Sequence, residues 1–178
     1  MEKILISACL LGQIVRYDAK EVPFENSQLS QWQEEGRLIT VCPEVSGGLP
    51  VPRPAAEIIG GEGKTVLAGQ ARLLNIEGED VTGYFLKGAF AALTTARRFN
   101  IKMAILKANS PSCGNALIYD GTFSGVKKSG KGVTAALLEE NSIRVFNEME
   151  IAEAAGYLKE LEQQSNDSEK SLLISQEK

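Results

Sequence analysis

The chain contains three cysteines, Cys9, Cys42 and Cys113, and no histidine. Each cysteine comes at or after the end of a short apolar run that is typical of a buried strand. These runs are residues 3–8, 37–41 and 101–106. Because parallel strands place their carboxyl ends at one edge of a sheet, we expect the three thiols to lie close together. The sequence therefore predicts a single metal or iron–sulfur site at that edge.

Two simpler interpretations of the cysteines are buried packing and a disulfide. Free cysteine often behaves as a small buried hydrophobe, but all three thiols follow strand ends. A disulfide is disfavoured by the odd number of cysteines and by the reducing compartment we expect.

The number of thiols limits what the site can hold. Structural zinc usually takes four protein ligands, often in Cys-x-x-Cys pairs, and this chain has no such pair. A [4Fe–4S] cluster normally takes four cysteines, so three would leave one iron open, which suggests catalysis. Soft sulfur donors without imidazole suit iron–sulfur better than magnesium or calcium.

Polar groups beside the cysteines are candidates for proton transfer and substrate binding. Glu44 follows Cys42 by two residues, and without histidine it is the best general acid or base. Ser110 and Ser112, beside Cys113, are expected to bond the substrate or the sulfur atoms. Ordinary turn chemistry and a solvated surface glutamate are the alternatives.

Four further residues fall on the same predicted edge. Arg16, Tyr17 and Asp18 follow the first strand, and Tyr17 is suited to stacking on a flat ring. Arg53 closes a proline-rich loop and is suited to binding an anion. For each of the four, a plain surface role is an equal alternative.

The elements that must position these groups alternate between strands and helices. A fourth strand is expected at 143–146, and helices at 28–36, capped by Ser27, and at 80–99, 133–140 and 148–161. The helix at 80–99 has an apolar face of Phe85, Leu86, Ala89, Phe90, Leu93 and Ala96, with Asp80 or Thr82 as its cap and Asn100 at its end.

Two less regular stretches complete the prediction. Residues 56–74 suggest a small antiparallel excursion that includes Thr65-Val66-Leu67. A hairpin is expected around Asp120-Gly121, pairing 117–119 with 122–123. The fold class is then a single-domain, three-layer α/β sandwich with a mostly parallel, Rossmann-like sheet. This domain spans residues 1–162, and 163–178 form a polar, frayed tail.

Composition excludes several classes of function. The formal net charge is −4, which argues against duplex nucleic acid as a partner. No apolar run approaches the length of a membrane span. The sequence has no glycine-rich phosphate loop, so we do not predict a nucleotide cofactor. Residues 6–9 look like a lipoprotein cleavage box, but too few apolar residues precede them, so we expect a cytoplasmic protein. The oligomeric state is left open.

Longer motifs surround the candidate residues and resemble those of the thiouracil desulfidase family. They are residues 7–12 (SACLLG), 41–44 (VCPE), 47–50 (GGLP), 52–54 (PRP), 107–114 (KANSPSCG) and 119–123 (YDGTF). The resemblance covers residues 3 to 147, and nothing after Glu148 carries a match.

The resemblance implies a [4Fe–4S] cluster bound by Cys9, Cys42 and Cys113, with one iron not bound by protein. It also implies that the sulfur of a 2-thiolated pyrimidine binds that iron and that a carboxylate matching Glu44 activates water. Sulfide is then released without net redox change, with assistance from a serine matching Ser110. The expected partner is thus a small thiolated pyrimidine such as 2-thiouracil.

The competing hypothesis is a metal- or thiol-based sensor or binding protein without turnover. Glu44 beside Cys42 separates the two hypotheses, because a passive site does not need a proton-transfer group.

Overall fold

A parallel sheet forms the centre of the protein. The structure is a computed structural model that describes residues 1–21 and 24–176, and side chains up to residue 167. Its strands are β1 (Ile4–Ser7), β2 (Leu38–Val41), β5 (Met103–Leu106) and β8 (Arg144–Asn147). They lie in the order β2-β1-β5-β8, and every neighbouring pair is parallel. The four predicted strands are therefore confirmed within one or two residues at each end.

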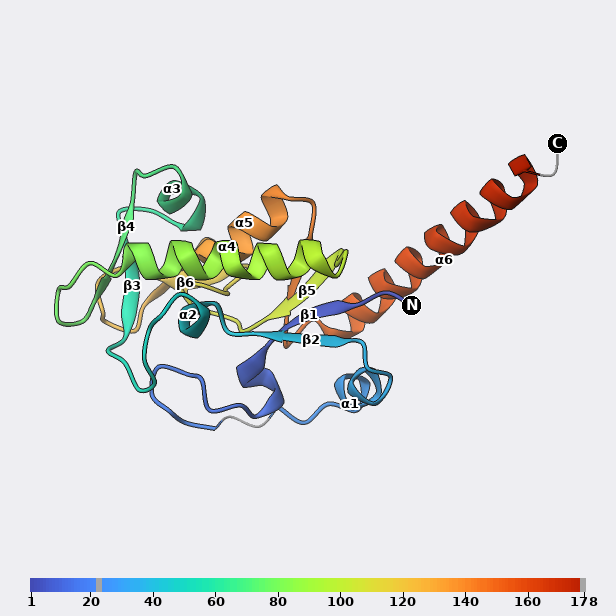
Figure 1. The fold of residues 1–178 in the computed structure, drawn as a ribbon. Helices are drawn as coiled ribbons and strands as arrows, with labels where there is room; N and C mark the ends of the chain where they lie inside the picture. The colour runs from blue at the N-terminus through green and yellow to red at the C-terminus, as the bar shows by residue number, and fades with distance from the viewer. Residues whose placement is uncertain (22–23, 177–178) are drawn as a thin grey trace.

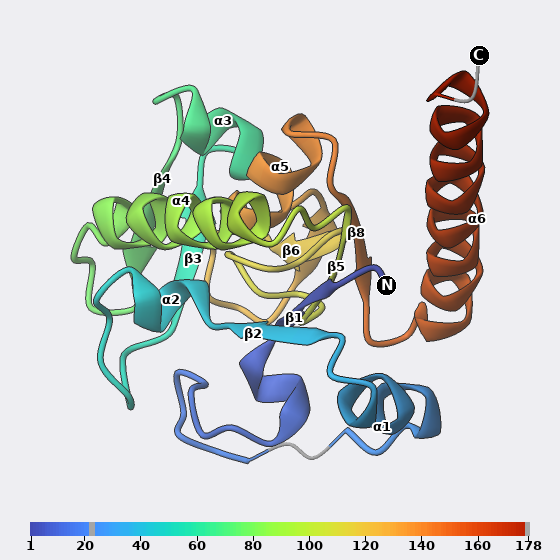
Figure 2. The same cartoon turned by 45° about the vertical axis from the view of Figure 1, so that its right-hand side comes forward.

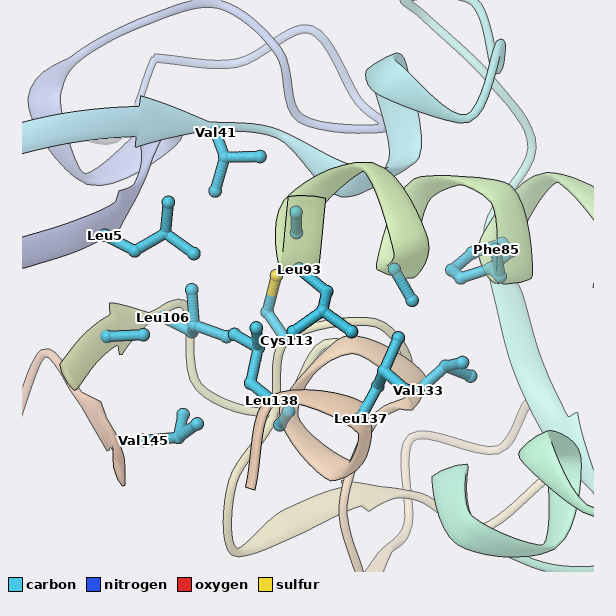
Figure 3. Close-up of a cluster of buried hydrophobic side chains, with 14 of the residues drawn as sticks. Leu5, Val41, Phe85, Leu93, Leu106, Cys113, Val133, Leu137, Leu138 and Val145 are labelled. Atoms are coloured by element: carbon cyan, nitrogen blue, oxygen red, sulfur yellow. The ribbon is translucent and has the colours of Figure 1, made fainter. Parts of the chain in front are cut away.

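Helices cover both faces of this sheet. On one face, α4 (Thr82–Arg98) and α5 (Val133–Glu140) pack on alternate strand residues such as Leu5 and Leu106 (Figure 3). On the other face, α1 (Ser27–Glu34) and α6 (Ile151–Gln176) pack on residues such as Ile6 and Ile105. This division produces the three-layer α/β sandwich that the sequence predicts (Figure 1).

Shorter elements connect the layers and surround the carboxyl ends of the strands. They are the 3-10 helix η1 (Ala8–Leu11), the helices α2 (Pro43–Ser46) and α3 (Gly63–Leu67), and the strands β3 (Ala56–Ile59), β4 (Arg72–Asn75), β6 (Leu117–Tyr119) and β7 (Lys127–Ser129). Strands β3 and β4 pair antiparallel, as do β6 and β7. No helix in the described part of the chain is long and apolar enough to cross a membrane.

Two local predictions are wrong. Residues 65–67 belong to helix α3, because Glu62 and Thr65 form a capping box that starts a helix there. Strand β6 pairs with 127–129 and not with 122–123. Phe123 has a φ of 57°, outside the extended range, and its N–H bonds Glu57 instead of a neighbouring strand.

Details of the predicted helices also change. Phe90, expected on the buried face of α4, is 53% exposed. The N-cap of α4 is Val81, although Asp80 Oδ1 accepts the N–H of Thr82 at 2.9 Å. Asn26, not Ser27, caps α1, because its side chain accepts two N–H groups of the first turn.

Helix α6 continues well past its predicted end near residue 161 and projects from the domain (Figures 1 and 2). Glu162 pairs with Arg37 at 2.6 Å, and the Ser165 hydroxyl donates to Glu2 at 2.9 Å. These contacts join the helix to the domain as far as Ser165. The expected frayed tail at 163–178 is instead helical through Gln176. Residues 177–178 lie outside the described residues.

Helix α2 packs on α4 through backbone atoms. A Cβ on Gly88 would lie 1.9 Å from the carbonyl oxygen of Pro43, and a Cβ on Gly47 would lie 2.0 Å from that of Tyr84. Only glycine permits such an approach. Because Cys42 and Glu44 flank Pro43, this packing determines where both of them lie.

Replacing Gly88 with alanine is expected to displace α2 and lower the free energy of unfolding by about 1–3 kcal/mol. The matched control is Gly83→Ala in the same helix, where a Cβ would have no neighbour within 4 Å. That change should be neutral or stabilising by about 0.5–1 kcal/mol. Denaturant unfolding of the metal-free variants checks this, and equal midpoints for the two would contradict it.

Candidate functional site

The loops at the carboxyl ends of β1, β2 and β5 enclose a cavity of about 670 Å³. Cys9 lies in η1 directly after β1, Cys42 is the N-cap of α2 directly after β2, and Cys113 lies in the loop after β5. All three are free thiols and all three line this cavity. The parallel sheet thus brings together residues that are far apart in the sequence.

Burial keeps these thiols protonated. It raises the pKa of the Cys9 thiol to about 11, with a charge on Cys42 acting in the same direction. Burial likewise raises the pKa of Cys42, and most strongly that of Cys113, which is 6% exposed. Thiolates are the form that binds metal, so a cationic group entering here must displace protons and relieve the repulsion among the sulfur atoms.

Among the described residues, Ser7 and Val15 lie within hydrogen-bonding distance of cysteine sulfurs. The buried hydroxyl of Ser7 donates to Cys113 Sγ at 3.7 Å while it accepts the N–H of Lys107 at 3.0 Å. Because Ser7 Oγ carries one hydrogen, the bond from Lys107 leaves that hydrogen directed at the sulfur. Cys42 Sγ lies 3.8 Å from the carbonyl oxygen of Val15.

Glu44 faces the same cavity and is held by Arg53. Arg53 Nη2 and Nε lie 2.6 and 2.8 Å from Glu44 Oε2, and the Arg53 side chain is 4% exposed. Two more of its five N–H donors bond the carbonyl oxygens of Pro50 and Val15 at 3.0 and 3.1 Å. The expected anion site at Arg53 is therefore occupied by the chain's own carboxylate.

Ser110 is the second partner of Glu44. Its hydroxyl donates to Glu44 Oε1 at 3.3 Å and accepts the N–H groups of Ser112 and Cys113, each at 3.1 Å. Ser112, by contrast, is fully buried, bonds the Thr134 hydroxyl at 2.8 Å and does not line the cavity. Its expected substrate contact is not supported, because this bond fixes its hydroxyl outside the cavity.

The residues after β1 surround one side of the cavity mouth. Tyr17 lines the cavity and is 45% exposed, and its carbonyl accepts the N–H of Arg53 at 2.9 Å. Arg16 also lines the cavity and pairs with Asp18 at 3.2 Å. Of this group, Tyr17 presents a flat ring that a ligand can reach.

Sequence reasoning missed other residues of this region. Lys107 lines the cavity and pairs with Glu148, whose Oε2 accepts the N–H of Ala108 at 2.8 Å. Glu148 directly follows β8, so the strand-end argument that found the cysteines also applies to it. Glu57 and Phe123 line the cavity too, but they come from the antiparallel excursion and a turn, where no periodic signal indicated them.

The donor set decides which kind of group fits. In the described part of the chain, no three Cys, Asp or Glu side chains are grouped closely enough to hold one metal ion. A single zinc ion would need its thiolates to converge at about 2.3 Å. A polynuclear iron–sulfur cluster distributes its cysteines over several irons. Three soft donors that share one cavity without converging fit a cluster better than a single ion.

A family model, a relative and a solved structure match this chain, and the first and the last of them name thiouracil desulfurization. The model of the 2-thiouracil desulfurase family matches residues 4–150. The uncharacterized protein YbbK of Bacillus subtilis (strain 168) is 45% identical over 148 residues, covering 83% of this chain and 97% of YbbK. The solved structure of the [4Fe-4S]-dependent thiouracil desulfidase TudS is 43% identical with a TM-score of 0.82, covering 89% of this chain and 99% of that one.

The raised thiol pKa values predict that the metal-free protein loses stability in alkali. From pH 9.0, the ordinary pKa of a thiol, to about 11, the unfolded chain has released the Cys9 proton while the folded chain still holds it. The unfolded state then binds fewer protons, so the free energy of unfolding falls as the pH rises. Denaturant unfolding across this range checks the effect. The slope should be shallower in Cys9→Ser, and an unchanged slope would contradict the burial argument.

Proposed function

This chain belongs to the 2-thiouracil desulfurase family, and we propose that it is a desulfidase that removes sulfur from a 2-thiolated pyrimidine such as 2-thiouracil. In the proposed reaction, thiocarbonyl and water become carbonyl and hydrogen sulfide, so the atoms balance and no electrons are exchanged. The observation that carries the proposal is that Glu44, bonded to Ser110 and Arg53, lines the same cavity as the three thiols.

Cys9, Cys42 and Cys113 would hold the cofactor, a [4Fe–4S] cluster. When bound through three cysteines, such a cluster supplies a Lewis-acidic iron without a protein ligand, which suits a soft thiocarbonyl sulfur. The support is the family membership, the name of the TudS structure, and a cavity with three thiols and no histidine in the chain.

Glu44 would act as the general base toward water. Its Oε2 is occupied by Arg53, while within the described residues Oε1 bonds the hydroxyl of Ser110. Oε1 is therefore the oxygen with capacity to accept a proton from water. Arg53 fixes the carboxylate and offsets its charge in a largely buried setting.

Ser110 and Tyr17 would complete the site. The two N–H groups that bond Ser110 Oγ leave its single hydrogen facing Glu44 and the cavity. It can thus orient the carboxylate or donate to an oxygen that forms at the reacting carbon. Tyr17, exposed at the mouth, would stack on the pyrimidine ring.

Anaerobic reconstitution with iron and sulfide should give brown protein with a broad visible absorption band that releases sulfide from 2-thiouracil. Cys9→Ser, Cys42→Ser and Cys113→Ser should each lose the colour, because the cluster needs every thiol the chain has. Iron and sulfide analysis with absorption spectroscopy measures this. Wild-type protein that stays colourless would overturn the cofactor assignment.

Glu44→Gln should retain the cluster and lose turnover by about 10²–10⁴-fold, because the amide still accepts hydrogen bonds from Arg53 but cannot take a proton. Sulfide release per cluster is the measurement. A Glu44→Gln variant as active as wild type would exclude Glu44 as the base. Loaded wild-type protein without turnover on thiolated pyrimidines would instead indicate the non-catalytic sensor.

A further inference from the structure

We propose that Phe123 is a substrate-contacting wall of the cavity and that Glu57 is the positioning residue that holds it there. The inference rests on the proposed function, because it assumes that a flat pyrimidine occupies the cavity. It concerns residues 119–123, which have no role in the reaction at the thiols and Glu44 that is proposed above.

Glu57 is a buried carboxylate whose hydrogen bonds go to this turn. It lies on β3 with 7% of its surface exposed. Its Oε2 accepts the N–H groups of Gly121 at 2.9 Å and Phe123 at 3.1 Å, and among the described residues no cation pairs with it. Burying a carboxylate without a cation is costly. That cost is offset here by two bonds that fix one loop.

The turn itself adopts a conformation that needs such support. Phe123 has a φ of 57°, a value that non-glycine residues rarely adopt. Gly121 has a φ of 96°, and a Cβ there would lie 2.7 Å from the carbonyl oxygen of Ile58, so the turn packs directly on β3. Strained backbone of this kind persists where the surroundings hold it and concentrates at functional sites.

The strained conformation brings an aromatic side chain to the cavity. Phe123 is half-buried and, together with Tyr119 at the end of β6, lines the cavity that holds Cys113 and Glu44. Phe123 belongs to neither of the two buried hydrophobic clusters, and its place in the cavity lining would let a ligand contact it. Stacking on a base needs only a flat apolar face, which an aromatic wall supplies whatever the base.

The test measures KM and kcat of the cluster-loaded enzyme with 2-thiouracil, and binding of uracil, which has no sulfur to hold. Phe123→Ala should raise KM and weaken uracil binding by about 5–150-fold with little change in kcat. The matched control is Phe90→Ala, an exposed phenylalanine on α4 outside the cavity lining. Phe123→Leu, which keeps an apolar side chain, should fall between wild type and Phe123→Ala.

Glu57→Ala should reproduce the rise in KM. Glu57→Gln should keep the KM of the wild type, because an amide oxygen still accepts both N–H groups. Hydrogen exchange at the Phe123 amide is a second readout, which needs no turnover: it should accelerate in Glu57→Ala and stay slow in Glu57→Gln. If Glu57→Ala does not fold, Glu57→Gln and Phe123→Leu carry the test.

Three ways of failing are distinguishable. If the wild type turns over and Phe123→Ala has the same KM and the same uracil binding as the wild type, this inference is overturned and the proposed function stands. A wild-type protein that gains no cluster and releases no sulfide would overturn the proposed function. Exchange at Phe123 that is the same in Glu57→Ala and wild type would overturn the positioning role alone.

Discussion

The parallel direction of the central strands is the constraint on which the site depends. Because β1, β2 and β5 run the same way, the segments that follow them open at one edge, and Cys9, Cys42 and Cys113 line one cavity there. An antiparallel β5 would place Cys113 at the opposite edge. The register is supported from both faces, since alternate residues of β1 and β5 belong to two separate hydrophobic clusters.

A second layer of packing turns this edge into a reactive site. The backbone contact between α2 and α4 fixes Pro43, and with it the flanking Cys42 and Glu44. Arg53 and Ser110 then take one oxygen each of the Glu44 carboxylate. The result is a carboxylate in a fixed position beside thiols whose neutral form burial favours until a cationic group replaces their protons. In the reaction that we propose, this rigidity would help to hold the attacking water in one place.

Much of the fold could be predicted from the sequence, because the short apolar runs and the alternation of strands and helices are strong local signals. The strand ends also indicated which residues lie along one edge, including Glu44 and Ser110. The features that could not be predicted depend on contacts between residues that are separated in the sequence. Three such features have no periodic signal in the sequence. They are the ion pair of Arg53 with Glu44, the buried bond of Ser112 to Thr134, and the turn held by Glu57. Helix α6 contacts the N-terminal part of the domain through Glu162 and Ser165, whose partners Arg37 and Glu2 are far away in sequence.

We propose that the chain hydrolyses a carbon–sulfur bond with water activated at Glu44 in the thiol-lined cavity. The most direct measurement is anaerobic turnover of 2-thiouracil by cluster-loaded protein in ¹⁸O-labelled water without reductant, with mass analysis of the uracil. Hydrolysis should place one labelled oxygen in uracil for each sulfide released. Sulfide release that requires a reductant, or uracil without the label, would contradict it.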